Sequence, residues 1–240
     1  MLFETCVYTN KGGRDNNEDY CTCGDGIWVL CDGLGGHDCG EVASETGASA
    51  ALRFAEENGP SFDDKFLKDI LSEANSSVIA MQKDEKLKGM RTTIVLAFTD
   101  GKKIRYANVG DSRFYYFKNN SLAYTSEDHS VSALSARLGD ISYDDIRNDV
   151  DRNKLIKVLG NEPDINVKIP NVIIPVESGD AFLLCSDGFW EHVYETEMEL
   201  DLAKSDSAQE WMNYMIKRIL LKTRNIGNDN FTAAGVMISD

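Results

Sequence analysis

The chain has 240 residues, of which 42% are hydrophobic, and a formal net charge of −15. This composition supplies enough apolar material for one large folded domain and excludes general disorder. The acidic excess argues against a nucleic-acid partner, because phosphate backbones are bound by clustered Lys and Arg. No apolar stretch approaches the roughly 20 residues that a membrane span requires. The N-terminal residues lack a secretory signal pattern. We therefore expect a cytoplasmic protein without a membrane partner.

The first third of the sequence predicts strands followed by two helices. β-rich runs at residues 3–9 and 27–31 flank a polar loop. A first helix is expected from about Asp38, a good N-cap residue, to residue 58. Ser61, with an acidic residue three positions later, predicts a capping box for a second helix. Its buried stripe is expected to consist of Phe62, Phe66, Ile70, Ala74, Val78 and Met81.

The remainder predicts a β meander, an insertion, and a return to strands and one helix. The meander has runs at residues 93–98, 104–109, 114–117 and 122–124. Residues 127–160 are polar, with short helical pieces, and an insertion of that length between strands is usually functional. Further strands are expected at 165–174 and 181–185. A helix is expected to begin at about Ser207, with Glu210 completing a capping box, and a last strand follows Asp229.

The six cysteines are expected to be reduced thiols. Cys21, Cys23, Cys31, His37 and Cys39 are close in sequence, but their spacing matches no familiar zinc-ligand pair. A free cysteine is often simply a small core residue. We therefore expect mostly buried thiols and no zinc site.

Four acidic signatures lie where apolar runs begin or end. They read IWVLCDGLGG at 27–36, YANVGDSR at 106–113, FLLCSDGFW at 182–190 and GNDNFTAAGVMI at 227–238. Each places a carboxylate where a strand meets a loop. If these carboxylates converge, they repel one another unless a cation lies between them. Oxygen-only ligands suit Mg²⁺ or Mn²⁺. The pattern therefore predicts a divalent-metal enzyme.

Five motifs in order resemble those of the metal-dependent protein phosphatases, the type 2C serine/threonine phosphatases, and the compact length resembles the bacterial branch. The motifs are Arg14-x-x-x-Glu18-Asp19, Cys31-Asp32-Gly33-x-Gly35-Gly36-His37, Gly110-Asp111-Ser112-Arg113, Ser186-Asp187-Gly188 and Asp229-Asn230-Phe231-Thr232. Asp-Gly alone is a common turn, but five motifs in family order are specific. The resemblance implies an α+β fold, a four-layer αββα sandwich of two antiparallel sheets flanked by helices. It also implies a single domain over residues 1–240, with a flap at about 130–159.

The resemblance also implies a binuclear centre of Mn²⁺ or Mg²⁺. In it, Asp32 bridges two ions, the Gly33 carbonyl binds one of them, and Asp187 and Asp229 hold the other. Asp19 orients metal-bound water from a second layer around the ions. A weaker third ion is expected between Asp111 and Asp187, with Glu191 as a possible helper.

Around these ions, Arg14 is expected to bind the substrate phosphate, since its planar fork can grip two phosphate oxygens. His37 is expected to support the site. Some relatives carry His directly after the bridging Asp-Gly as a general acid, but this chain has Leu34 there. We therefore assign no general acid. His129 is expected to be structural.

The resulting hypothesis is a phosphatase that hydrolyses phosphoserine and phosphothreonine with a water activated by two metal ions. Its partners would be phosphorylated proteins, the targets of a serine/threonine kinase, and we expect a monomer. One alternative is a catalytically weak phosphatase fold that serves as a regulatory or phosphate-sensing module, which the complete carboxylate set disfavours. Another is a metal-dependent nuclease or nucleotidase, which the acidic composition disfavours.

Overall fold

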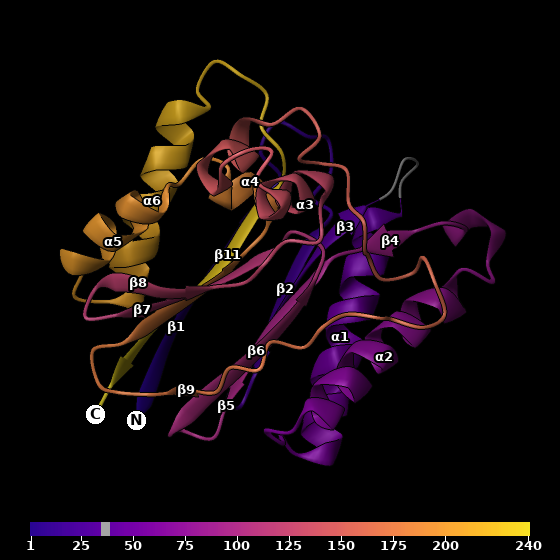
Figure 1. The fold of residues 1–240 in the computed structure, drawn as a ribbon, viewed down its shortest axis with the longest axis horizontal. Coiled ribbons are helices and arrows are strands. Elements are labelled where there is room, and N and C mark those ends of the chain that lie inside the picture. The colour runs from indigo at the N-terminus through magenta and orange to yellow at the C-terminus, as the bar shows by residue number, and fades with distance from the viewer. Residues whose placement is uncertain (35–38) are drawn as a thin grey trace.

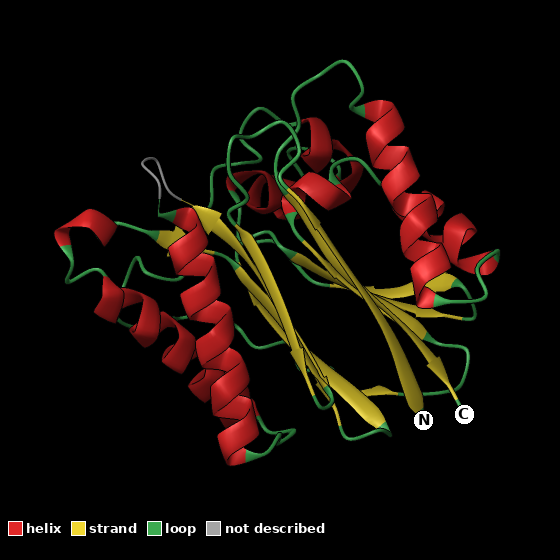
Figure 2. Cartoon of the chain, turned by 180° about the vertical axis from the view of Figure 1, so that it is seen from behind, coloured by secondary structure: helices red, strands yellow, loops and turns green. Residues whose placement is uncertain are grey.

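The computed structural model describes residues 1–34 and 39–240. Two antiparallel sheets pack face to face, and helices cover the outer face of each sheet (Figures 1 and 2). The expected four-layer αββα sandwich is therefore confirmed. The predicted start of the first helix at Asp38 lies outside the described residues.

Neighbouring strands are antiparallel throughout both sheets. The first sheet has the order β1 (Leu2–Asn10), β11 (Phe231–Ser239), β10 (Ala181–Cys185), β7 (Arg113–Lys118) and β8 (Ser121–Thr125). The second has the order β2 (Asp19–Gly24), β3 (Ile27–Leu34), β5 (Ile94–Thr99), β6 (Lys103–Val109) and β9 (Ile174–Pro175), and β4 (Arg91–Thr92) also pairs with β3.

The helices divide between the two outer faces and one end of the sandwich. The second sheet is covered by α1 (Gly40–Asn58) and α2 (Asp64–Met81), with the short η1 (Glu85–Leu87) after them. The first sheet is covered by α5 (Glu195–Ala203) and α6 (Ala208–Lys222). The end of the sandwich carries α3 (Val131–Leu138), η2 (Tyr143–Asn148) and α4 (Asp187–Trp190).

Three hydrophobic clusters fill the spaces between the four layers. Strand β10 shows the pattern: Leu183 packs towards α5 and α6, whereas Phe182 and Leu184 pack between the sheets. Strand β3 does the same on the other sheet, with Val29 facing the α1–α2 side and Leu30 facing the first sheet. Because both faces of these strands are buried, they read as continuous apolar runs rather than as alternating ones.

The second helix begins later than the capping-box pattern predicts. It starts at Asp64, and the Asp63 carboxylate caps it by accepting a hydrogen bond from the Phe66 N–H at 2.7 Å. The Ser61 hydroxyl instead donates to Asp63 at 2.7 Å. A carboxylate is the stronger acceptor and also interacts favourably with the helix dipole. The predicted stripe is buried at Phe66, Ile70, Ala74 and Val78, but Phe62 precedes the helix and Met81 is 41% exposed.

The strand predicted at 165–174 is wrong for most of its length. Only Ile174 and Pro175 pair, with β6. Val167 and Ile169 are nevertheless buried against the α1–α2 side of the second sheet. Pro170 interrupts the run and has no N–H to donate. The alternation of apolar and polar residues in this run therefore reflects side-chain burial and not a hydrogen-bonded ladder.

At the last helix, the Ser207 hydroxyl accepts a hydrogen bond from the Glu210 N–H, as expected. The Glu210 carboxylate, however, accepts from the Asp206 N–H and not from the Ser207 N–H that a capping box requires.

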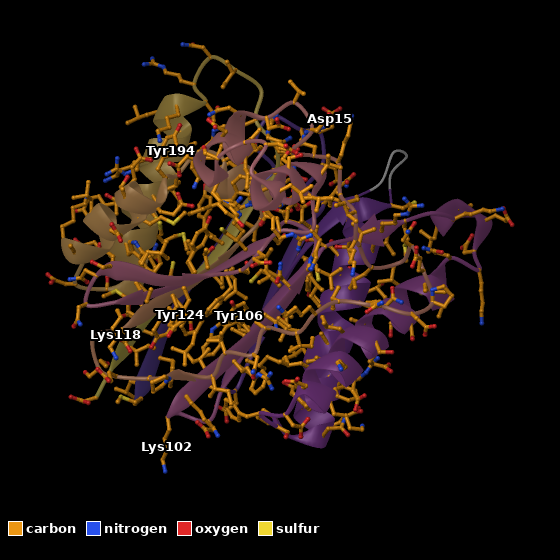
Figure 3. All side chains as sticks on the ribbon, viewed as in Figure 1. Asp15, Lys102, Tyr106, Lys118, Tyr124 and Tyr194 are labelled. Carbon is orange, nitrogen blue, oxygen red and sulfur yellow. The ribbon has the colours of Figure 1, made fainter. Side chains whose placement is uncertain are left out.

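The acidic signatures all lie at one end of the sandwich. β2 begins there, β3, β6 and β10 end there, and β11 begins there, whereas both termini lie at the opposite end (Figure 1). Asp15, in the loop before β2, lies far from Lys102 in the turn between β5 and β6 (Figure 3). The strand order thus brings segments distant in sequence to one edge. No helix in the described ranges is long and apolar enough to cross a membrane.

Residues 126–160, called here the α3–η2 segment, cross this end of the sandwich. Its two arms are tied together, because Ser130 bridges Leu155 and the Ile156 N–H donates to the His129 carbonyl at 2.8 Å. A second bridge joins Leu159 to Thr92 beside β3. The segment is therefore an ordered cover over the strand ends and not a loose loop.

Candidate metal and phosphate site

Five aspartates reach this end from five different places in the fold. Asp19 begins β2 and pairs in register with Asp32 on β3. Asp111 occupies the turn between β6 and β7, Asp187 is the first residue of α4, and Asp229 lies just before β11. Asp19 and Asp111 are buried, and the other three are partly exposed.

Electrostatics shows that these carboxylates converge. The pKa of Asp32 is raised well above its usual value, first because burial disfavours the charged form and then through repulsion by Asp19, Asp187, Asp111 and Asp229. Like charges disfavour ionisation only over short separations. Asp19, Asp111, Asp187 and Asp229 therefore lie close enough to Asp32 for their charges to act on it.

The Asp19 carboxyl group is held in place by the strands of the other sheet. The Ser186 hydroxyl donates to its Oδ2 at 2.8 Å, and Ser186 Oγ in turn accepts from the Thr232 N–H at 3.0 Å. Burial raises the pKa of Asp19 to about 7 despite these hydrogen bonds. Its Oδ1 is buried with no hydrogen-bond partner among the described residues. This oxygen faces a region where only a cation or a donor would satisfy it.

Asp187 and Asp229 are brought together by close backbone packing at Gly188. A Cβ atom on Gly188 would lie 2.1 Å from the Asn230 carbonyl oxygen and 3.3 Å from the Asp229 Cβ. Only glycine allows that approach. Burial raises the pKa of Asp187 to about 7, and repulsion by Glu191 and Asp229 adds to the effect.

The turn that carries Asp111 is fixed from three sides. The Trp190 indole N–H donates to the Asp111 carbonyl at 2.9 Å. Ser112 Oγ and Thr93 Oγ1 are hydrogen-bonded at 2.7 Å. The His129 N–H donates to the Gly110 carbonyl at 2.8 Å, and its Nδ1 accepts from the Gly110 N–H at 3.3 Å. His129 therefore supports the turn, as its predicted structural role requires.

Arg14 lies at the rim of the cluster. Its Nη2 donates to Asp229 Oδ2 at 2.6 Å, and its side chain is 61% exposed. The pKa of its guanidinium is raised first by the hydrogen bond and the attraction to Asp229, and then by attraction to the negative charges of Asp187 and Glu18. The guanidinium thus stands between solvent and the carboxylates, where an incoming phosphate would meet it.

The loop that carries Arg14 is attached to the Asp229 loop by Asn230. The Asn230 amide donates to the carbonyls of Lys11 and Asn16 at 2.9 and 2.8 Å, and its Oδ1 accepts from the Glu18 N–H at 2.8 Å. Asn230 is buried. One side chain therefore holds both ends of the Arg14 loop.

Gly33 is required for a packing reason that the sequence did not reveal. A Cβ at this position would lie 2.1 Å from the Gly40 carbonyl oxygen and 2.7 Å from that of Glu18. Its N–H also donates to the Glu18 carbonyl at 3.0 Å. The start of α1 and the Glu18 backbone therefore leave no room for a side chain beside Asp32.

Three other positions singled out in the sequence are His37, Leu34 and Glu191. His37 lies outside the described residues. Leu34 ends β3, opposite Arg91 in register. The Glu191 carboxylate is ion-paired with Arg152 Nε of the α3–η2 segment, and it lies close enough to Asp187 to raise the pKa of that residue.

The residues present fit hard divalent cations. All candidate donors are carboxylate or carbonyl oxygens, they repel one another, and one buried oxygen of Asp19 lacks a partner among the described residues. Within residues 1–34 and 39–240, however, no three His, Cys, Asp or Glu side chains already surround one point as a closed metal cage. The oxygen chemistry of the donors and their mutual repulsion are therefore what favour a bound cation.

Sequence reasoning missed the residues that hold this site together. Ser186 and Asn230 stand inside the quoted motifs, and Trp190 ends the third signature. The motifs themselves do not show that these three side chains hold the aspartates in place. A signal was available for Ser186 and Asn230, because a polar residue directly beside a motif aspartate can form a hydrogen bond that holds the site in place.

The raised pKa values predict that the metal-free protein loses stability as pH rises. Folded Asp19 and Asp187 keep their protons up to about pH 7, whereas a free Asp releases its proton near 3.8. The folded state therefore binds more protons between about pH 4 and pH 7, so its stability falls across that window. In EDTA, we expect the melting temperature to drop by at least about 3 °C across the window.

Asp187→Asn should flatten this profile, because the substitution removes one titrating group, and saturating Mn²⁺ should remove the drop in the wild type. The exposed Asp25→Asn is the control and should keep the wild-type profile. Thermal unfolding followed by circular dichroism measures all four curves. A wild-type melting temperature that rises steadily from pH 5 to pH 8 in EDTA would contradict the prediction.

Comparison with known proteins identifies the family. A family model described as protein phosphatase 2C matches residues 11–224. A serine/threonine phosphatase stp of Listeria welshimeri is 36% identical over 206 residues, which covers 82% of this chain and 77% of the relative.

Solved structures agree over the whole fold. The crystal structure of serine/threonine phosphatase Stp1 from Staphylococcus aureus superposes with a TM-score of 0.89 at 27% identity and covers 100% of this chain and 96% of that one. The catalytic domain of the serine/threonine protein phosphatase PstP, in complex with two manganese ions, gives a TM-score of 0.84 at 26% identity over 99% of each chain. The chain therefore belongs to the protein phosphatase 2C family of metal-dependent protein phosphatases.

Proposed function

We propose that this protein hydrolyses phosphoserine and phosphothreonine in phosphorylated proteins. The observation that carries the proposal is the convergence of Asp19, Asp111, Asp187 and Asp229 on Asp32, seen in the raised pKa of Asp32. Such a cluster is costly to the fold by itself, and it suits a binuclear cation site of the kind used for phosphoryl transfer. Family membership supports the same reaction.

We assign Asp32, the Gly33 carbonyl, Asp187 and Asp229 to the two core ions, which would be Mn²⁺ or Mg²⁺. When bound, these ions supply an activated water and neutralise charge on the phosphate. Asp19 has a supporting place, because Ser186 fixes one of its oxygens and leaves the other directed at the cluster. Its role is to orient water beside the ions.

The task of Arg14 is to bind and orient the phosphate. Its guanidinium lies at the exposed rim, already engaged with a carboxylate at 2.6 Å. A phosphate oxygen offers the same charge and similar geometry, so it can compete for the planar fork. Holding the phosphate at the rim aligns it with the cluster, and charge that develops on its oxygens meets a fixed cation. Leu34 has no acidic proton, so this chain must protonate the leaving oxygen by another route.

A third, weaker ion is proposed between Asp111 and Asp187. The pKa of Asp111 is raised by burial and next by repulsion from Asp187, so the two carboxylates lie close together. A site with few protein ligands keeps more water and binds weakly. Glu191 lies close enough to Asp187 to raise the pKa of that residue, and its ion pair with Arg152 of the α3–η2 segment must open before it can assist.

The α3–η2 segment is proposed as the flap beside the site, corresponding to the predicted residues 130–159 of a single domain over 1–240. Its exposed apolar side chains, Leu138, Tyr143 and Val150, are available to a protein substrate. The expected partners are targets of a serine/threonine kinase, and the expected state is a monomer. We place the protein in the cytoplasm.

The central prediction is metal-dependent hydrolysis that requires Asp32. With Mn²⁺, the wild type should hydrolyse p-nitrophenyl phosphate and a phosphothreonine peptide, and EDTA should abolish both activities. Asp32→Asn should reduce kcat at least about 100-fold, because the central bridging charge is lost. Circular dichroism should show an intact fold, and Asp25→Asn should behave as wild type. Near-native turnover of Asp32→Asn at saturating Mn²⁺ would contradict the two-ion proposal.

Arg14→Ala should weaken substrate binding more than it slows the reaction. We expect KM for a phosphothreonine peptide to rise about 10-fold, equivalent to about 1.4 kcal/mol of a charge-assisted contact. Arg14→Lys should be intermediate, because it keeps the charge but loses the planar fork. Arg53→Ala, an exposed arginine on α1, is the matched control. Inhibition by inorganic phosphate should weaken in parallel with KM, and an unchanged inhibition constant would remove Arg14 from the phosphate site.

Asp111→Ala should spare the two core ions but reduce turnover and raise the Mn²⁺ concentration needed for half-maximal activity. The reason is that only the weaker site loses a ligand. Isothermal titration calorimetry should show one fewer weak site in the variant, while kinetics shows the shifted metal dependence. Wild-type stoichiometry and wild-type metal dependence together would reduce Asp111 to a turn residue.

A further inference from the structure

A second group of buried side chains lies beside the carboxylate site, and the proposed reaction does not use it. It combines two cations, two carboxylates and two aromatic rings from β7, the α3–η2 segment, α4 and α5. We call it the arginine network, and its members are Arg113, Tyr115, Asp128, Arg147, Trp190 and Glu195.

The network is a continuous series of hydrogen bonds. Arg113 Nε and Nη2 donate to the two oxygens of Asp128 at 2.9 and 2.7 Å, and Nη1 donates to the Tyr115 hydroxyl at 3.0 Å. That hydroxyl donates to Glu195 Oε1 at 3.1 Å. Arg147 Nη2 donates to the other oxygen of Glu195 at 2.5 Å. The α3–η2 segment is thus joined to β7 through Asp128 and to α5 through Arg147.

The charges of the network balance one another, and three of the four charged side chains are shielded from water, whereas Glu195 is 32% exposed. The side chains of Arg113, Asp128 and Arg147 are 10%, 3% and 5% exposed. A buried charge without its partner is strongly unfavourable, so removing one member leaves another uncompensated. Arg147 Nη1 is itself buried without a hydrogen-bond partner in the described part of the chain.

Trp190 connects this network to the candidate ligands. The Arg113 guanidinium carbon lies 3.6 Å from the centre of its ring, and that of Arg147 lies 5.5 Å away. The indole N–H donates to the Asp111 carbonyl at 2.9 Å. Trp190 also ends α4, the short helix that Asp187 begins. The position of this ring therefore determines where the Asp111 turn lies relative to Asp187.

Within the α3–η2 segment, Arg147 lies beside both Trp190 of α4 and Glu195 of α5. Besides Glu195 and Trp190, it lies 5.0 Å from the ring of Tyr194, which leads into α5 (Figure 3). A movement of η2 would therefore act on Asp111 through a single side chain, that of Trp190.

We propose that Arg147 is a positioning residue that, through Glu195 and Trp190, holds Asp111 at the distance from Asp187 that the weaker third cation requires. The inference rests on the third-ion part of the proposed function. It assigns to the α3–η2 segment a direct influence on cation affinity, in addition to any contact with substrate. Residues that orient metal ligands typically change affinity by about 10-fold or more when they are removed.

The test is a calorimetric titration of metal-free protein with Mn²⁺, which needs no substrate. Arg147→Met should raise the dissociation constant of the weakest Mn²⁺ site about 10-fold and leave the tighter sites unchanged. Arg147→Lys should give a smaller increase, because it keeps a cation near Glu195. Glu195→Gln should also weaken that site. The double variant should be no weaker than the worse single variant, because both changes act through one contact.

Arg137→Met is the matched control, since Arg137 is an exposed arginine in the same segment. It should titrate as wild type. Thermal unfolding of every variant separates loss of fold from loss of the site: a purely structural role would lower the melting temperature without a selective change at the weakest site. If Arg147→Met does not fold, Arg147→Lys and Glu195→Gln carry the test.

Two outcomes overturn the inference. One is a wild-type protein with only two Mn²⁺ sites, and the other is folded Arg147 and Glu195 variants whose weakest site is unchanged. These results are distinct from failure of the proposed function, in which the wild type binds Mn²⁺ normally but hydrolyses no phosphopeptide.

Discussion

Repulsion among buried carboxylates at one end of the sandwich is the constraint on which the rest of this structure depends. Burial raises the pKa of Asp32, and the charges of four other aspartates raise it further. A chain of this size has only marginal net stability to offset such a cluster. The three apolar clusters between the four layers supply that stability elsewhere in the fold, where both faces of β3, β5, β7 and β10 are buried. The apolar clusters of the sandwich therefore offset a carboxylate cluster that is unfavourable for folding but useful for chemistry.

The carboxylates are held by a frame of uncharged contacts. Ser186 fixes Asp19, Trp190 fixes the Asp111 turn, and Asn230 ties the Arg14 loop to the Asp229 loop. Glycine at 33 and 188 lets backbone approach where any side chain would collide. Preorganisation of this kind matters for catalysis, because groups that are already oriented need not reorganise when charge develops. The α3–η2 segment reaches the site through two arginines: Arg152 contacts Glu191, and Arg147 approaches Trp190.

The distribution of charge fits this arrangement. The chain carries −15 overall, yet cations concentrate around the site, with Arg14 at the rim and Arg113 and Arg147 buried behind Trp190. Arg113 lowers the pKa of Asp111, against the larger effects of burial and of Asp187 and Asp128. Local pairing, rather than net charge, therefore decides how each carboxylate behaves, and an acidic protein can still receive an anionic phosphate at this edge.

The sequence by itself determined the elements with strong local signals. Runs of β-type residues predict the strands β6 and β10. The aspartates stand out because Asp-Gly after an apolar run marks the end of a strand. It could not determine that residues 165–173 lie extended without a ladder, since burial and pairing produce the same alternation. It also placed the cap of the second helix on Ser61, because two possible caps compete locally and only the folded backbone selects Asp63. Tertiary structure alone decided which side chains orient the aspartates. Ser186, Asn230 and Trp190 act across separations of many residues, and such contacts leave no periodic trace in the chain.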